Sequence, residues 1–184
     1  IYPNRVHLIG SFMEDVKKIA SNREYTTISG YYRGVGISVT STGIGAPSTS
    51  IAIEELARIG AKTLIRVGST GALDEKIKCG DLIINTASVR YDGATKDYVN
   101  PFYPAVASYE VTLALIEACE KLQYKYHVGI GASRDTFYGV QERPSFKNYH
   151  QSFMDNLIDD LEKANVLNLE MEASTVFTLS NLFG

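Results

Sequence analysis

Two glycine-rich turns in this chain combine residue types that can bind an anion. Gly43–Gly45 follows a β-branched run at residues 37–41, and the second turn reads Arg66-Val67-Gly68-Ser69-Thr70-Gly71. A cation, two hydroxyls and backbone amides exposed by glycine together form an oxyanion cradle. Turns of this kind also occur in many α/β proteins without binding anything, so a purely structural role stays open. Neither G-x-G-x-x-G nor a P-loop pattern is present, so dinucleotides and P-loop chemistry are not favoured.

The segments around these turns predict strand, turn, helix, strand and turn in succession. Pro47 suits a first helical turn, apolar residues recur from Ile51 to Ile59, and Gly60 closes the helix. The whole chain shows the same alternation, which predicts an α/β fold. We expect helices over 6–20, 51–59, 108–122, 150–164 and 172–183, and strands over 1–3, 25–33, 35–41, 62–67, 80–89, 126–133 and 165–169. Residues 90–104 are expected to form a polar loop at the site mouth or at an interface, and 137–147 to be irregular.

Composition narrows the function classes. The 184 residues fit one domain, and the net charge of −3 gives no electrostatic footprint for nucleic acid or an anionic membrane. No apolar run is long enough to span a bilayer, and no signal peptide is visible. Cys79 and Cys119 are too few for a disulfide framework or a zinc site, so we expect two reduced thiols in a cytoplasmic protein.

Two carboxylates follow the last predicted strand, where ligands gather in open α/β sheets. Glu170 and Glu172 invite an interpretation as an acid–base pair for hydrolysis. We expect these two side chains to point to opposite sides at the strand end, which weakens that interpretation.

The run from Gly43 to Leu73, read with Arg23-Glu24-Tyr25-Thr26-Thr27, resembles the nucleoside phosphorylase family. Phe137-Tyr138-Gly139-Val140-Gln141-Glu142-Arg143 and Glu170-Met171-Glu172 resemble its uridine-cleaving members. The resemblance implies a three-layer αβα sandwich with a central mixed sheet, of the phosphorylase/hydrolase type. It also implies reversible conversion of uridine and phosphate to uracil and ribose 1-phosphate, in a homo-oligomer that needs no organic cofactor. Because family chains extend further, we expect residues 1–184 to be a single domain that is incomplete at both ends.

The resemblance also assigns the phosphate ligands. Arg5 and Arg66 match the family's phosphate-binding arginines, and Ser69 stands where the family usually has threonine, which keeps the hydroxyl. Arg23 matches an arginine that crosses into the neighbouring subunit's phosphate site. A guanidinium at a helix amino terminus suits a dianion, although an ordinary solvated arginine is the alternative for Arg5.

Ribose and base ligands follow from the later motifs. The resemblance implies that Glu172 accepts hydrogen bonds from ribose hydroxyls, with Met171 beneath the sugar and Ser69 nearby. The amide of Gln141 matches the N3–H and carbonyl edge of uracil. Arg143 would stabilise the charge that develops on the departing base, and the ring of Phe137 would stack on that base. Purine-specific relatives lack the glutamine–arginine pair, so uridine is favoured over inosine.

Three residues match an intersubunit cation site of some bacterial members. In those members the matching positions hold a monovalent ion such as potassium, and oxygen ligands suit such a hard cation. The three residues here are Glu24, Ile44 and Ser48. A buried structural cluster is an equal alternative. Two rivals to uridine phosphorolysis also stay open: a purine nucleoside phosphorylase or nucleosidase of the same family, and a non-catalytic nucleoside- or phosphate-binding module.

Overall fold

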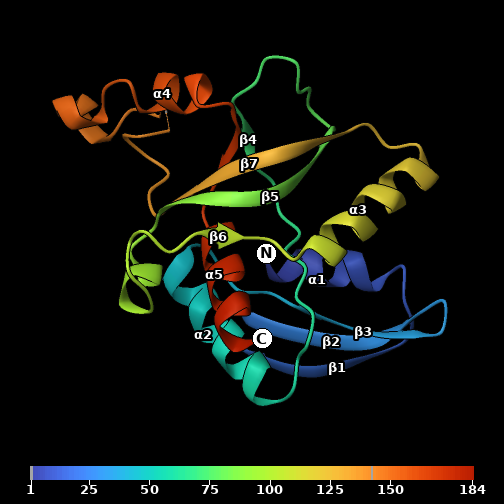
Figure 1. Ribbon diagram of the computed structural model, residues 1–184. Helices are drawn as coiled ribbons and strands as arrows, with labels where there is room; N and C mark the ends of the chain where they lie inside the picture. Colours follow the sequence, from blue (N-terminus) through green and yellow to red (C-terminus); the bar gives the residue numbers. More distant parts are fainter. Residues whose placement is uncertain (1, 142) are drawn as a thin grey trace.

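Three parallel strands form the centre of a mixed sheet in the computed structural model, which describes residues 2–141 and 143–184 (Figure 1). They are β5 (Leu82–Tyr91), β7 (Tyr126–Arg134) and β8 (Val166–Glu170), and the sheet order is β4-β8-β7-β5-β6. The short strands β4 (Gly71–Ala72) and β6 (Ala105–Val106) pair antiparallel at the two edges. Parallel pairing sets the ends of β7 and β8 together, with Ser133 opposite Glu170. The predicted strands 80–89, 126–133 and 165–169 are therefore confirmed within two residues.

Helices cover both sides of this sheet. Figure 1 shows it between α4 (Leu157–Lys163) and the neighbouring helices α2 (Ala46–Arg58) and α5 (Ala173–Phe183). The helix α3 (Tyr109–Leu122) contacts β5. Among the described residues, no helix combines the length and the apolar character that a membrane crossing requires. The expected α/β class with a central mixed sheet is confirmed.

Apolar residues from these layers form two cores. Between α4 and the sheet, Leu161 packs with Val166 and Leu169 of β8. Between α2 and α5, Ile53 packs with Leu179. The two cores fix β8 and α5, the elements on either side of Glu170–Glu172.

The predicted helix over 6–20 is confirmed only as far as Gly10 and is wrong beyond it. The helix α1 (Pro3–Gly10) is followed by a strand, β1 (Glu14–Asn22). Gly10 ends the helix against Ile28, whose Cδ1 atom would lie 2.4 Å from a Cβ atom at that position. Antiparallel pairing of β1 with the next strand then overrides the apparent helical period, which the strand residues Val16 and Ile19 had extended. Pro3 belongs to α1 rather than to a strand, and Ile1 lies outside the described residues.

The amino-terminal strands form a second sheet that the sequence analysis did not separate from the first. In it, β1 pairs with β2 (Tyr25–Tyr32), which pairs with β3 (Val35–Thr40), all antiparallel (Figure 1). The β2–β3 turn is Arg33-Gly34 with φ angles of 50° and 79°, as a tight hairpin requires. One face of this sheet packs on α1 through Val6 and Ile28. The predicted strands 25–33 and 35–41 are confirmed.

The predicted strand over 62–67 is wrong. Residues 61–70 belong to no sheet, and only Gly71–Ala72 pairs, antiparallel, with β8. Leu64 packs against the core between α2 and α5, whereas Ile65 and Val67 are exposed. The segment also lines a cavity of about 1000 Å³ together with parts of β5 and α5.

The predicted helix over 150–164 is shorter than expected. Its regular part, α4, begins only at Leu157, after Asn156 in a left-handed conformation with φ of 62°. Short 3₁₀ turns precede it at Phe146–Asn148 and Ser152–Met154, and another occupies Ala94–Asp97 in the loop over 90–104.

A carboxylate at the start of β5 gives a stability prediction. Asp81 accepts hydrogen bonds from Lys125 Nζ at 2.8 Å, the Lys78 backbone N–H at 3.0 Å and His127 Nε2 at 2.9 Å. These bonds, that from Lys125 foremost, hold the pKa of Asp81 well below its ordinary value. A lowered carboxyl pKa stabilises the fold above about pH 4 and ceases to do so as the pH falls through the folded-state pKa. Asp81→Asn should therefore lower Tm at pH 7, and the deficit should shrink below pH 4 in thermal unfolding scans. Glu14→Gln, an exposed change on β1, is the control, and a deficit that is independent of pH would contradict the prediction.

Candidate active site

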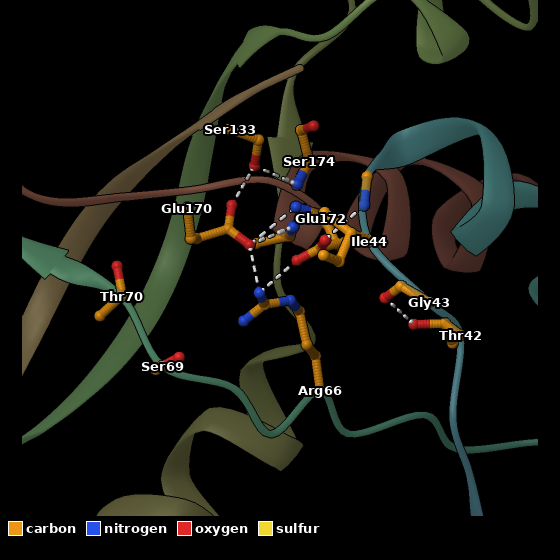
Figure 2. A network of polar contacts seen from close by, with 12 residues as sticks. Thr42, Gly43, Ile44, Arg66, Ser69, Thr70, Ser133, Glu170, Glu172 and Ser174 are labelled. Carbon is orange, nitrogen blue, oxygen red and sulfur yellow. Dashed lines mark hydrogen bonds and ion pairs between the residues drawn. The ribbon is translucent and has the colours of Figure 1, made fainter. Parts of the chain in front are cut away.

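The site centres on the Arg66 guanidinium, which lies between two carboxylates (Figure 2). Its Nη2 atom lies 2.9 Å from Glu170 Oε2 and 2.5 Å from Glu172 Oε2. The Arg66 side chain is 22% exposed, while those of the two glutamates are 2% and 11% exposed. The expectation that the glutamates point to opposite sides is wrong, because residues i and i+2 of an extended strand lie on the same face. Glu172 lies beyond the end of β8, with ψ of −20°, so the chain has already turned toward α5.

Glu170 receives hydrogen bonds on both carboxylate oxygens. Its Oε1 accepts from the Ser133 hydroxyl, and its Oε2 accepts from Arg66 and from the backbone N–H groups of Glu172 at 2.8 Å and Ala173 at 2.9 Å. The two N–H groups belong to the start of α5, so the carboxylate also satisfies this helix terminus. With every described bond an accepting one, Glu170 is not available to donate a proton for hydrolysis.

Glu172 connects Arg66 to the first glycine turn. Its Oε1 accepts from the Gly45 backbone N–H at 2.5 Å, and its Oε2 accepts from Arg66. Gly45 has φ of 91° and ψ of 164°, a conformation that only glycine adopts readily, which explains the residue type at this turn. A carboxylate can accept about four hydrogen bonds, so Glu172 retains capacity for two more donors.

A second arginine approaches the second glycine turn from the amino-terminal helix. Arg5, in the first turns of α1, donates from Nη2 to Ser69 Oγ at 3.1 Å. A Cβ atom at Gly68 would lie 2.8 Å from Arg66 Nη1, so a side chain there would displace the guanidinium. The hydroxyl of the neighbouring Thr70 instead donates to the Leu169 carbonyl of β8 at 2.8 Å. The structure thus brings Arg5 to Ser69, and it folds Arg66 back over the same turn.

The predicted base-binding residues share one loop after β7. The Arg143 guanidinium lies 4.2 Å from the ring centroid of Phe137, and Gln141 Nε2 donates to the Thr136 carbonyl at 2.7 Å. The Gly139 N–H donates to the Arg143 carbonyl at 2.6 Å, which closes the loop. Glu142 of the same motif lies outside the described residues. Within residues 2–141 and 143–184, no hydrogen bond or ion pair joins Phe137, Gln141 or Arg143 to the Arg66 cluster.

The predicted cation ligands gather around Gly43. Ser48 Oγ donates to the Ile44 carbonyl at 3.0 Å. A Cβ atom at Gly43 would lie 2.8 Å from Glu24 Cγ and 3.4 Å from Ser48 Oγ. The Glu24 side chain, the Ser48 hydroxyl and the Ile44 carbonyl therefore lie near one turn, and oxygen donors of these kinds fit a hard monovalent cation. Arg23 precedes Glu24 in the β1–β2 turn and is exposed.

A buried polar network behind Glu170 was missed by the sequence analysis. Ser133 Oγ accepts from the Ser174 N–H at 2.8 Å, and Ser174 Oγ donates to Asp92 Oδ2 at 2.6 Å. Asp92, Ser133 and Ser174 are each 0% exposed. The available signal was polar residues at the carboxyl ends of the predicted parallel strands, where Asp92 follows β5 and Ser133 closes β7.

Comparison with known proteins identifies a matching family and several similar nucleoside phosphorylases. Residues 2–184 match a family described as the Phosphorylase superfamily. The uridine phosphorylase of Thermococcus kodakarensis is 59% identical over 182 residues, which cover 99% of this chain and 66% of that protein. The uridine phosphorylase of Escherichia coli is 43% identical, covering 96% and 70%. The guanosine phosphorylase of Halorubrum lacusprofundi is 37% identical, covering 99% and 70%. The chain thus spans about two thirds of the length of these relatives.

Proposed function

The chain belongs to the phosphorylase superfamily, and from this premise we propose that it catalyses the phosphorolysis of uridine to uracil and ribose 1-phosphate. One observation carries the proposal: Arg66, at an anion-binding turn, is paired with Glu172, which retains acceptor capacity for ribose hydroxyls. A cation for phosphate and a carboxylate for ribose therefore meet where the two substrates must react.

Phosphate itself is the nucleophile, so the protein needs none of its own. A phosphate oxygen bonds to C1′ while the C1′–N1 bond breaks. The electron pair of the C1′–N1 bond leaves with uracil. Arg5, Ser69 and Arg66 hold the phosphate, because guanidinium and hydroxyl donors match its oxygens. No organic cofactor is required for this step.

The sugar and the base each have a set of ligands. Glu172 accepts from the ribose hydroxyls above Met171, and its negative charge stabilises the oxocarbenium-like transition state. Gln141 pairs with the uracil edge, Phe137 stacks on the base, and Arg143 stabilises the charge that the base acquires.

We further propose that the working protein is a cytoplasmic homo-oligomer with shared sites. The exposed Arg23 serves the neighbouring subunit's phosphate, and a potassium ion beside Glu24, Ile44 and Ser48 stabilises the interface. If the ion binds there, replacing potassium by tetramethylammonium lowers Tm. No change would argue for the purely structural cluster.

Mixing two defective variants tests the shared site. Arg23→Ala and Glu172→Ala proteins should each be nearly inactive. Refolded together, they should form mixed dimers in which one site carries both defects and the other neither, restoring up to about half the activity per mixed dimer. If proven mixed dimers stay inactive, Arg23 acts within its own chain.

The similarity to a guanosine phosphorylase favours one second candidate, purine nucleoside phosphorolysis. Incubating the protein with uridine, inosine or guanosine, with and without phosphate, distinguishes the candidates by the base and sugar released. We expect ribose 1-phosphate and uracil, formed only with phosphate. Free ribose released without phosphate would indicate a nucleosidase, and binding without cleavage would indicate a non-catalytic module.

A further inference from the structure

Arg66 has two carboxylate partners, and they differ in what they can still bind. Glu170 already accepts four hydrogen bonds, from Ser133, Arg66 and the N–H groups of Glu172 and Ala173. A carboxylate has about four lone-pair sites, so Glu170 has no capacity left for a ribose hydroxyl. Among residues 2–141 and 143–184, Glu172 accepts from Gly45 and Arg66 alone.

The surroundings of Glu170 are also the more rigid. Its side chain is 2% exposed at the end of β8. Ser133 ties it to β7, and the two N–H groups tie it to the start of α5. Behind Ser133, the network continues through Ser174 to Asp92. A side chain bonded to three elements keeps its orientation when substrates enter.

The Arg66–Glu170 and Arg66–Glu172 ion pairs are therefore expected to change differently during the reaction. When Glu172 accepts ribose hydroxyls at its remaining lone pairs, its negative charge is shared between the ribose and Arg66, so its pair with Arg66 weakens. Glu170 has no such competitor and remains bonded to Arg66 Nη2. Nη1 and Nε of the guanidinium have no hydrogen-bond or ion-pair partner in the described part of the chain, and they can then face phosphate.

Building on the proposed function, we propose that Glu170 is a positioning residue that holds the Arg66 guanidinium in place for phosphate and touches no substrate atom. This role differs from that of Glu172, although the two residues lie two positions apart and share one nitrogen.

Glu170→Gln tests the role, because it preserves shape but removes the charge and one acceptor. We expect the phosphate KM to rise about 10- to 100-fold, the range for losing a charge-assisted hydrogen bond, while the uridine KM changes less than about threefold. Glu170→Asp, which keeps the charge at a shorter reach, should give an intermediate phosphate KM. Glu75→Gln, an exposed change, is the matched control and should alter neither constant.

Two results would overturn the proposal. A raised uridine KM, with lost preference between uridine and 2′-deoxyuridine, would place Glu170 on the ribose. Unchanged KM values with a lowered Tm would make it a purely structural residue. If Glu170→Gln does not fold, Ser133→Ala should raise the phosphate KM by a smaller factor, and an unchanged value in that folded variant would equally refute the role.

Failure of the proposed function gives a separate signal. If the unmodified protein does not cleave uridine, phosphorolysis fails whatever Glu170 does. Calorimetric titration with inorganic phosphate, which needs no turnover, then decides the positioning role by comparing the unmodified protein with Glu170→Gln. Equal phosphate affinity in the two would reject it.

Discussion

Replacing Arg66 with alanine should raise the phosphate KM by a factor of about 30 to 1000, or about 2–4 kcal/mol, the range for truncating one partner of a desolvated charge pair. The change removes the cation that Glu170 and Glu172 share, so two nearly buried carboxylates would face the incoming dianion without compensation. Steady-state rates over a range of phosphate concentrations, at fixed uridine, measure the effect.

Two further variants sharpen this prediction. Arg66→Lys keeps the charge but cannot bond two carboxylates and phosphate at once, so it should recover only part of the loss. Arg58→Ala removes an arginine whose side chain is 77% exposed, and it should leave the phosphate KM unchanged. An Arg66→Ala protein with normal phosphate dependence would remove Arg66 from the phosphate site.

The elements that sequence could predict are those whose local pattern agrees with their tertiary setting. In α2, Pro47 at the first turn and Gly60 after the last favour the same bounds as the apolar period. The helix predicted over residues 6–20 is too long because Val6, Ile9 and Met13 do share one core, and the apolar spacing then continues by coincidence into β1. The strand predicted over residues 62–67 is wrong because β propensity describes how well a residue fits a half-buried surface. It does not supply a strand to pair with.

The candidate site, like the fold, could be predicted only in part from the sequence. The types and spacing around Arg66 and Ser69 predict an anion-binding turn, and the order of the motifs relates Arg66 to Glu172. The two-residue period of a strand places Glu170 and Glu172 on one face, but their convergence on one nitrogen depends on where β8 ends and how the chain turns into α5. Asp92 acts through a side-chain network, and no local pattern encodes that partner.

The second large expected effect is on the choice of nucleobase, which we attribute to the loop after β7. Arg143→Ala should lower kcat/KM for uridine about 100- to 1000-fold, because the base loses the charge that stabilises it as the C1′–N1 bond breaks. Gln141→Ala should lower it about 100-fold and narrow the preference for uridine over inosine, since polar atoms of uracil would be left unpaired.

The loop's own contacts make these changes interpretable. Arg143 lies over the Phe137 ring, on which uracil is proposed to stack, and Gln141 bonds the carbonyl of Thr136, the residue before Phe137. Tyr138→Phe is the matched control, because it removes only a hydroxyl from an exposed ring packed edge-on against Phe137. That variant should keep the kcat/KM values for both nucleosides. If the unmodified protein cleaves inosine as fast as uridine, or if Gln141→Ala keeps the full preference, Gln141 does not read the base.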